Sequence, residues 1–162
     1  MSAWFRTFGY ASVYRGLIVG AMPLDEVDVR LLSGFGVRGV LNLTEDSEYA
    51  PGARRKVEQA LAAAGIEERR LSTEDYGALS PALLEQATGI VNAWLDDDVI
   101  VYLHCRAGWQ RSAAVAAGTI AVRDRTDIPT ALERVRSLKP TADPLPHQCD
   151  DLERWLASRL RG

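Results

Sequence analysis

A cysteine and an arginine lie close together in the segment His104-Cys105-Arg106-Ala107-Gly108-Trp109-Gln110-Arg111-Ser112. A cysteine thiolate is a strong nucleophile. The planar guanidinium of Arg111 can hold two oxygens of a phosphate at once. Gly108 lets the backbone curl closely around an anion, because glycine has no Cβ. These residue types at this spacing indicate nucleophilic attack on a bound phosphate. Residues 104–112 are called the cysteine loop below.

The segments on either side of the cysteine loop are expected to position it. Val99–Leu103 is a short apolar run that predicts a buried strand, and the small residues of Ser112–Val122 predict a tightly packed helix. A loop from strand to helix turns several backbone N–H groups toward one point, and the helix N-terminus adds partial positive charge. We therefore expect Cys105 to be a thiolate at neutral pH. Ser112 is expected to donate a hydrogen bond to its sulfur, and His104 to brace the loop.

The pattern His-Cys-x5-Arg-Ser is specific. In a chain with two His and two Cys, chance would produce it on the order of once in several thousand sequences. The alternative is a buried structural cysteine beside a hydrogen-bonded histidine, which is the usual meaning of an isolated His-Cys pair. The glycine in the loop and the strand–loop–helix context argue against this alternative.

The segment from Val99 to Ser112 resembles the signature loop of the protein tyrosine phosphatase superfamily. The aromatic Trp109 and the serine at 112 make it most similar to the dual-specificity branch. Less specific similarity extends over most of the chain, through GLIVGAMP (16–23), GVLNLTED (39–46) and ALERVRSLKPTADP with a later glutamine (131–148). The resemblance implies a compact α/β fold, a covalent phosphocysteine intermediate, and no metal or other cofactor. Phosphate and vanadate are the expected inhibitory oxyanions.

A general acid is needed because the leaving alcohol or phenol takes up a proton. Glu67, Glu74 and Asp75 are the candidates by residue type. In the dual-specificity branch the acid occupies a loop about 30 positions before the cysteine, and this resemblance selects Asp75. Glu74 is the alternative, because a shift of one residue would exchange the two. The predicted loop that contains both, residues 72–79, is called the acid loop below.

The remaining residues of the cysteine loop are expected to bind substrate: Arg106, Ala107, Gly108, Trp109 and Gln110. Arg106 is compatible with a second acidic group on the substrate and equally with a surface carboxylate. Trp109 is a candidate aromatic wall. A single extra cation favours a phosphorylated protein over an inositol phosphate, and a small phosphomonoester such as a phosphoinositide or nucleotide is the alternative substrate.

Three further residues have both a functional and a plain structural interpretation. Asp46 either borders the pocket or lies on a surface loop. Gln148 resembles a glutamine that some relatives use near the active site, or it lies on a helix surface. Cys149 either forms a regulatory disulfide with Cys105 or packs as a small hydrophobe.

Hydrophobic periodicity and chain breakers predict alternating strands and helices. The predicted strands span 13–19 (one strand or a pair), 40–43, 67–71 and 99–103. The predicted helices begin at Pro23, with Leu24, Val27, Leu31 and Leu32 on one face, and continue with 53–64, 81–95, 112–122, 130–138 and 144–160. The alternation predicts one α/β domain over residues 1–162, with a largely parallel sheet covered by helices on both sides.

Composition excludes several other classes. The chain has 162 residues, 47% of them hydrophobic and 25% charged, with a net charge of −3. This balance provides no electrostatic footprint for nucleic acid. We find neither a signal-peptide pattern nor an apolar run of about 20 residues that would span a membrane. Two cysteines are too few for a disulfide framework, so a reducing cytoplasm is the expected location.

Two other functions share part of this residue pattern. A phosphate-binding module without turnover would lack the cysteine, the arginine or the acid, and candidates for all three are present. Sulfur transfer and arsenate reduction also use a cysteine on an anion-binding loop, but they do not require Arg111, Ser112 and an upstream acid together. Arsenate reduction also needs nearby resolving thiols, and Cys149 is the only other cysteine. The sequence therefore predicts a metal-independent phosphoric monoester hydrolase.

Overall fold

The computed structural model describes residues 1–162 and contains one five-stranded sheet of order β1-β2-β5-β3-β4. The strands are β1 (Tyr10–Tyr14), β2 (Leu17–Gly20), β3 (Val37–Asn42), β4 (Glu67–Arg70) and β5 (Ile100–His104). β1 and β2 form an antiparallel hairpin at one edge, and every other pairing is parallel. The predicted largely parallel sheet is confirmed, and the segment predicted as one strand or two is a pair.

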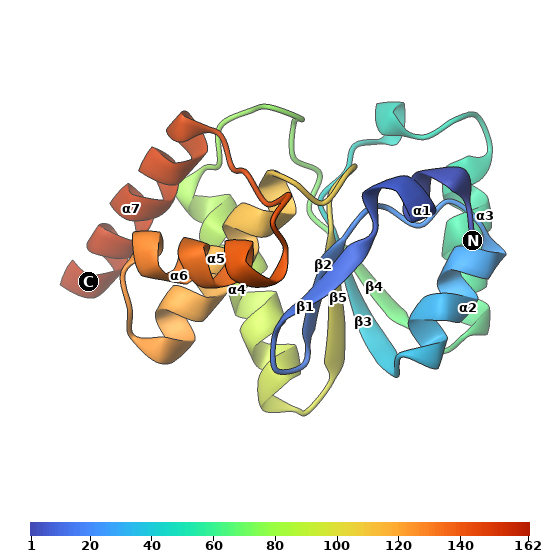
Figure 1. Cartoon of the computed structure of the whole chain (residues 1–162), viewed down its shortest axis with the longest axis horizontal. Coiled ribbons are helices and arrows are strands. Elements are labelled where there is room, and N and C mark those ends of the chain that lie inside the picture. The colour runs from blue at the N-terminus through green and yellow to red at the C-terminus, as the bar shows by residue number, and fades with distance from the viewer.

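Helices cover both faces of the sheet (Figure 1). One face carries α4 (Pro81–Asp96), α5 (Arg111–Asp124), α6 (Ile128–Leu138) and α7 (Pro146–Arg161). The other carries α1 (Ala3–Phe8), α2 (Glu26–Gly34) and α3 (Ala53–Ala63), and a short 3-10 helix, η1 (Asp46–Glu48), follows β3. No helix is both long and apolar enough to cross a bilayer.

The N-terminal part of the chain departs from the prediction. Helix α1 was not predicted, and the expected buried face of α2 was partly wrong, because Val27 is exposed while Asp28 and Val29 are buried. The reason is tertiary. The Asp28 carboxylate accepts hydrogen bonds from the backbone N–H (2.7 Å) and hydroxyl (2.6 Å) of Ser2 and from the Leu24 N–H (2.9 Å). A buried carboxylate is tolerated when hydrogen bonds compensate it, and this one ties α1 to α2.

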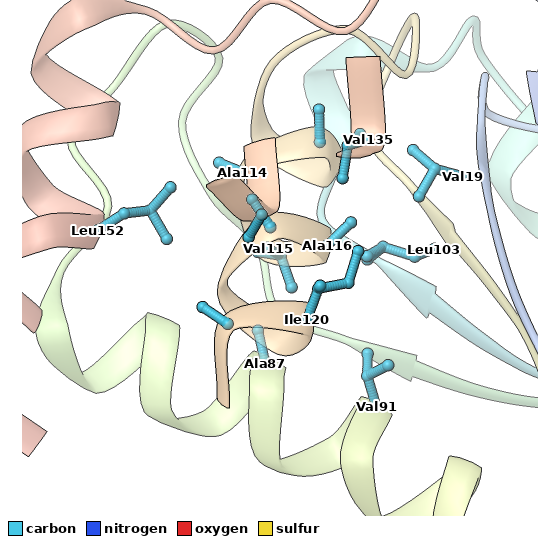
Figure 2. Packing of buried hydrophobic residues seen from close by; sticks show 14 of the residues in the cluster. Val19, Ala87, Val91, Leu103, Ala114, Val115, Ala116, Ile120, Val135 and Leu152 are labelled. Atoms are coloured by element: carbon cyan, nitrogen blue, oxygen red, sulfur yellow. The ribbon is translucent and has the colours of Figure 1, made fainter. Parts of the chain in front are cut away.

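Helix α5 forms the centre of the larger core. All its residues from Arg111 to Ala121 are buried. Figure 2 shows the side chains of Val115 and Ile120 directed into the cluster, with Leu103 of β5 on one side and Leu152 of α7 on the other. Alanine and glycine allow other helices to approach α5 closely. The helix that follows the cysteine loop is therefore enclosed on all sides and holds its first turn rigidly.

Candidate active site

Cys105 lies where β5 ends and the cysteine loop begins, and Arg111 opens α5. The Cys105 thiol is almost fully buried, and its Sγ lies 3.2 Å from the Ser112 Oγ. With the sulfur as a thiolate, the serine hydroxyl is the only possible donor of this hydrogen bond. The predicted nucleophile and its predicted hydrogen-bond partner are thus adjacent.

The carbonyl groups of the cysteine loop turn toward the protein. The Arg106 carbonyl accepts from the Met22 N–H (3.0 Å) and from the Trp4 indole (2.8 Å), and the Trp109 carbonyl accepts from the Asp143 N–H (2.7 Å). None of the backbone N–H groups of residues 106–110 donates a hydrogen bond within the protein. Free amides gathered in one loop are the arrangement that binds an anion.

Gly108 is required for this backbone path. It has φ +77°, in the left-handed region. A Cβ at this position would stand 2.5 Å from the carbonyl carbon of Gly20, which is backbone and cannot rotate away. Glycine therefore lets the loop press against the end of β2.

Arg111 is held in place by a carboxylate that the sequence analysis missed. Its guanidinium is 1% exposed and forms a two-pronged ion pair with Glu48, with Nη1 2.9 Å from Oε2 and Nη2 2.7 Å from Oε1. The Thr73 carbonyl accepts a further hydrogen bond from Nη1 at 2.8 Å. The Arg111 Nε is buried and has no partner within the protein. One donor of the fork is therefore left for a ligand.

Helix η1 turns Glu48 inward. The Glu45 N–H donates to the Glu48 Oε2 at 2.7 Å, which fixes the side chain toward Arg111. Burial alone would raise the pKa of the Glu48 carboxyl, but hydrogen bonds from Arg111 and Glu45 outweigh it and hold the pKa below its ordinary value. Asp46, which the sequence analysis considered, is instead exposed and pairs with Arg70 at 2.5 Å. One physical argument could have pointed to a residue such as Glu48, because a buried arginine requires a carboxylate partner.

Of the candidate acids, Asp75 reaches the site. Its Oδ1 lies 3.2 Å from the Arg111 Nη2. Glu74 is exposed, and its carboxylate lies against Gly77 instead. Glu67 is on the exposed side of the edge strand β4. The geometry therefore distinguishes the two adjacent carboxylates that sequence reasoning left as alternatives.

His104 braces the loop from inside the protein. The ring is fully buried, and its Nδ1 lies 3.0 Å from the carbonyl oxygen of Cys105. Burial lowers the pKa of His104 to about 4, so the imidazole is neutral at pH 7. A neutral ring with its proton on Nδ1 donates to that carbonyl, which agrees with the expected bracing role.

A cavity of about 220 Å³ opens over the thiol. Besides the cysteine loop, it is lined by Asp75 and Tyr76 of the acid loop and by Trp4 and Phe8 of α1. Phe8 packs edge-on against Trp109 with ring centroids 5.6 Å apart, and the Arg106 guanidinium lies 5.4 Å from the centre of the Trp4 ring. Trp109 thus contributes to an aromatic wall as expected, and α1 adds two members that sequence reasoning did not find.

Gln148 and Cys149 occupy the first turns of α7. Gln148 is fully buried and donates to the Gly77 carbonyl at 3.1 Å, so it is not a surface residue. Cys149 is half-buried against the larger core, and burial is the main cause that raises the pKa of its thiol. Both cysteines are free thiols.

Comparisons with known proteins agree with this geometry. The model of a family described as a DSP-PTPase phosphatase of polymorphic toxin systems matches residues 20–124. A Mus musculus protein named phosphatidylglycerophosphatase and protein-tyrosine phosphatase 1 is 27% identical over 147 residues, covering 90% of this chain and 75% of its own. The Arabidopsis thaliana phosphatidylglycerophosphate phosphatase PTPMT2 is 30% identical over 129 residues, covering 76% of this chain and 52% of its own.

Solved structures share the fold. The crystal structure of PTPMT1 in complex with PI(5)P superposes with a TM-score of 0.82 and 24% identity, covering 94% of this chain and 97% of that one. Human DUSP28 superposes with a TM-score of 0.75 and 21% identity, covering 94% of this chain and 99% of that one.

Proposed function

The chain belongs to the DSP-PTPase phosphatase family, in the dual-specificity branch of the protein tyrosine phosphatase superfamily, and on this basis we propose its mechanism. It is a cysteine-dependent phosphatase. In the mechanism, Cys105 forms a phosphocysteine intermediate, Arg111 and the amides of the cysteine loop bind the phosphoryl oxygens, and Asp75 transfers the protons. No step requires a metal.

One observation carries this proposal: unpaired donors surround the thiol. The amides of residues 106–110 and the Arg111 Nε have no acceptor within the protein. A buried donor without a partner, such as the Arg111 Nε, is rare in folded proteins because it costs about 1–3 kcal/mol. A phosphate dianion in the loop would satisfy all of these donors together, and its phosphorus would lie next to the Cys105 sulfur. This supports a site built for a phosphoryl group.

The first step is displacement at phosphorus. The Cys105 thiolate attacks in line, the bond from phosphorus to the ester oxygen breaks, and protonated Asp75 gives its proton to the leaving oxygen. The loop donors hold the equatorial oxygens, where charge accumulates in the transition state. Glu48 keeps the Arg111 fork oriented through its two hydrogen bonds.

The second step releases phosphate. The Asp75 carboxylate takes a proton from water, the water oxygen attacks phosphorus, and the bond between sulfur and phosphorus breaks to restore the thiolate. Ser112, 3.2 Å from the sulfur, stabilises the returning negative charge by donating a hydrogen bond.

The proposed substrate is a phospholipid whose headgroup ends in a phosphomonoester. Trp4, Phe8 and Trp109 offer apolar surface beside the thiol, and Arg106 offers a cation for a second anionic group. A phosphodiester next to a terminal phosphate has this chemistry. The name of the mouse relative gives both phosphatidylglycerophosphate and protein tyrosine phosphate hydrolysis. The aromatic wall favours the lipid over the phosphoprotein that the loop composition alone favoured.

The mechanism is tested with para-nitrophenyl phosphate in the presence of a chelator, between about pH 4.5 and 8. We expect activity in the wild type, loss of activity in Cys105→Ser, and inhibition by vanadate. Rapid acid quenching followed by mass spectrometry should find phosphate on Cys105. Vanadate binding without turnover in folded wild type would favour a binding module instead. Neither binding nor turnover would show that the loop does not hold phosphate.

The substrate is tested by competition between classes. Phosphatidylglycerophosphate in mixed micelles should give a kcat/KM at least about tenfold above that of a phosphotyrosine peptide. Arg106→Gln should reduce the lipid reaction and leave para-nitrophenyl phosphate hydrolysis within about twofold, because that substrate has no second anionic group. A preference for the peptide would return the assignment to phosphoproteins.

A further inference from the structure

The tip of the acid loop is a tight turn in an unfavourable conformation. The Gly77 N–H donates to the Glu74 carbonyl at 3.0 Å, and a Cβ on Gly77 would stand 2.9 Å from the Glu74 Cβ. Between them, Tyr76 has φ +63°, although it is not glycine. This left-handed conformation is uncommon for a bulky residue and persists only where the surrounding structure enforces it. Asp75 immediately precedes Tyr76.

Two side chains from the start of α7 hold this turn. The His147 Nε2 lies 3.0 Å from the Tyr76 carbonyl oxygen and 3.3 Å from that of Gly77. The Gln148 amide Nε2 donates to the Gly77 carbonyl at 3.1 Å. Helix α7, about 70 positions further along the chain, therefore contacts the two residues that directly follow Asp75.

Gln148 is itself fixed. It is fully buried, and its Oε1 accepts from the backbone N–H of Leu145 at 3.0 Å, at the N-terminus of α7. One end of the amide thus caps the helix, and the other holds the acid loop. Further along α7, the Asp151 carboxylate accepts from the Leu79 N–H at 2.9 Å and secures the end of the same loop.

We propose that His147 and Gln148 are positioning residues that keep Asp75 at the leaving-group oxygen. They line no part of the cavity over Cys105 and touch none of the reacting atoms. Their loss would let the turn relax from its strained conformation and carry Asp75 away from Arg111. This inference rests on the proposed role of Asp75 as the general acid. Attack by Cys105 would continue, while delivery of the proton would slow.

The basicity of the leaving group separates these two parts of the reaction. Para-nitrophenolate departs readily without a proton, whereas phenolate depends on the acid. Gln148→Met keeps the length and burial of the side chain but removes both hydrogen bonds. We expect it to lower kcat/KM for phenyl phosphate about tenfold and kcat/KM for para-nitrophenyl phosphate less than about threefold, because kcat/KM reports the step in which the leaving group departs and excludes the later hydrolysis that both substrates share. A general loss of folded enzyme would lower both rates equally.

Matched variants isolate the contact. Gln148→Glu retains an acceptor for the Leu145 N–H but cannot donate to the Gly77 carbonyl, so it should behave like Gln148→Met. His147→Ala should show the same selectivity in weaker form, and His147→Gln, which restores a donor, should recover activity toward phenyl phosphate. Glu153→Gln, on the exposed side of α7, is the control that should change neither rate. Because His147 is exposed, its variants are expected to fold.

Asp75→Asn provides the reference. The proposal is supported if the His147 and Gln148 variants reproduce the selective loss seen in Asp75→Asn. It is overturned if Asp75→Asn is selective while these variants, verified as folded by thermal unfolding, leave the ratio of the two rates unchanged. If Asp75→Asn shows no selectivity, the assignment of the acid fails, and the positioning role fails with it.

Discussion

Acidification should destabilise the fold through His104, whose imidazole is fully buried and has no partner on Nε2. Burial lowers the pKa of His104 from 6.5 to about 4. Between these two pH values, His104 is protonated in the unfolded chain but neutral in the folded chain. The free energy of unfolding therefore falls as the pH drops from about 6.5 to about 4, by on the order of 3 kcal/mol in total. Above pH 6.5 this residue contributes no pH dependence.

Urea unfolding followed by tryptophan fluorescence at several pH values from 7 to 4 measures the effect. His104→Asn is the matched variant, because its amide can donate to the Cys105 carbonyl and does not titrate. The loss of stability between pH 6.5 and 4 should be smaller in the variant by about 3 kcal/mol. Glu48, with its lowered pKa, contributes stability that is lost as the pH falls below about 4.5. This contribution is common to both proteins and cancels in their difference.

Parallel curves for the two proteins between pH 6.5 and 4.5 would refute the reasoning. Such a result would mean that His104 accepts a proton in the folded state at its ordinary pKa. The ring would then be solvated or paired, and the tautomer that braces the cysteine loop could not be assigned from burial.

Two further predictions concern the phosphate site. Glu48→Gln should lower kcat/KM for para-nitrophenyl phosphate by about 10- to 100-fold, because it removes the charge that orients Arg111 in a buried pair. Asp46→Asn, in the same helical turn but exposed and paired with Arg70, should stay within about twofold, and equal losses in both would contradict the role of Glu48. Gly108→Ala should abolish vanadate binding measured by calorimetry and lower stability by about 1–3 kcal/mol, because its Cβ would meet the Gly20 backbone. Retained vanadate affinity would show that the loop backbone can shift.

The chemistry of the site is local in sequence, and for that reason much of it could be predicted. Cys105, Arg111 and Ser112 lie within one strand–loop–helix unit, and residue type and spacing largely determine their arrangement. Helix α4 was also predictable, because Ser80 caps its N-terminus by accepting from the Leu83 N–H, and Pro81 follows at the first helical position.

The parts that escaped prediction are set by tertiary contacts. Glu48 lies in a short polar segment with two other acidic residues. Its place in a capping box with Glu45 does not show that it contacts Arg111, 63 positions away. The position of α1 beside the site depends on Asp28 of α2, whose carboxylate accepts hydrogen bonds from Ser2 at the N-terminus of α1. The burial of Gln148 depends on the acid loop passing over α7. All of these contacts join residues far apart in the sequence, so neither a hydrophobic period nor a capping pattern reveals them.

The central position of β5 has a consequence for how the protein folds. β5 is the last strand in the chain, yet it separates the β1-β2 hairpin from the β3-β4 pair. Each of its residues 101–104 pairs on both sides; Val101, for example, has Leu17 on one side and Gly39 on the other. The sheet cannot become continuous until this strand inserts, and closing such long loops makes folding slow. Formation of the cysteine loop therefore coincides with the step that joins the two halves. Partially folded molecules would carry a thiol without an anion site, so catalytic activity should appear together with the final cooperative phase of refolding.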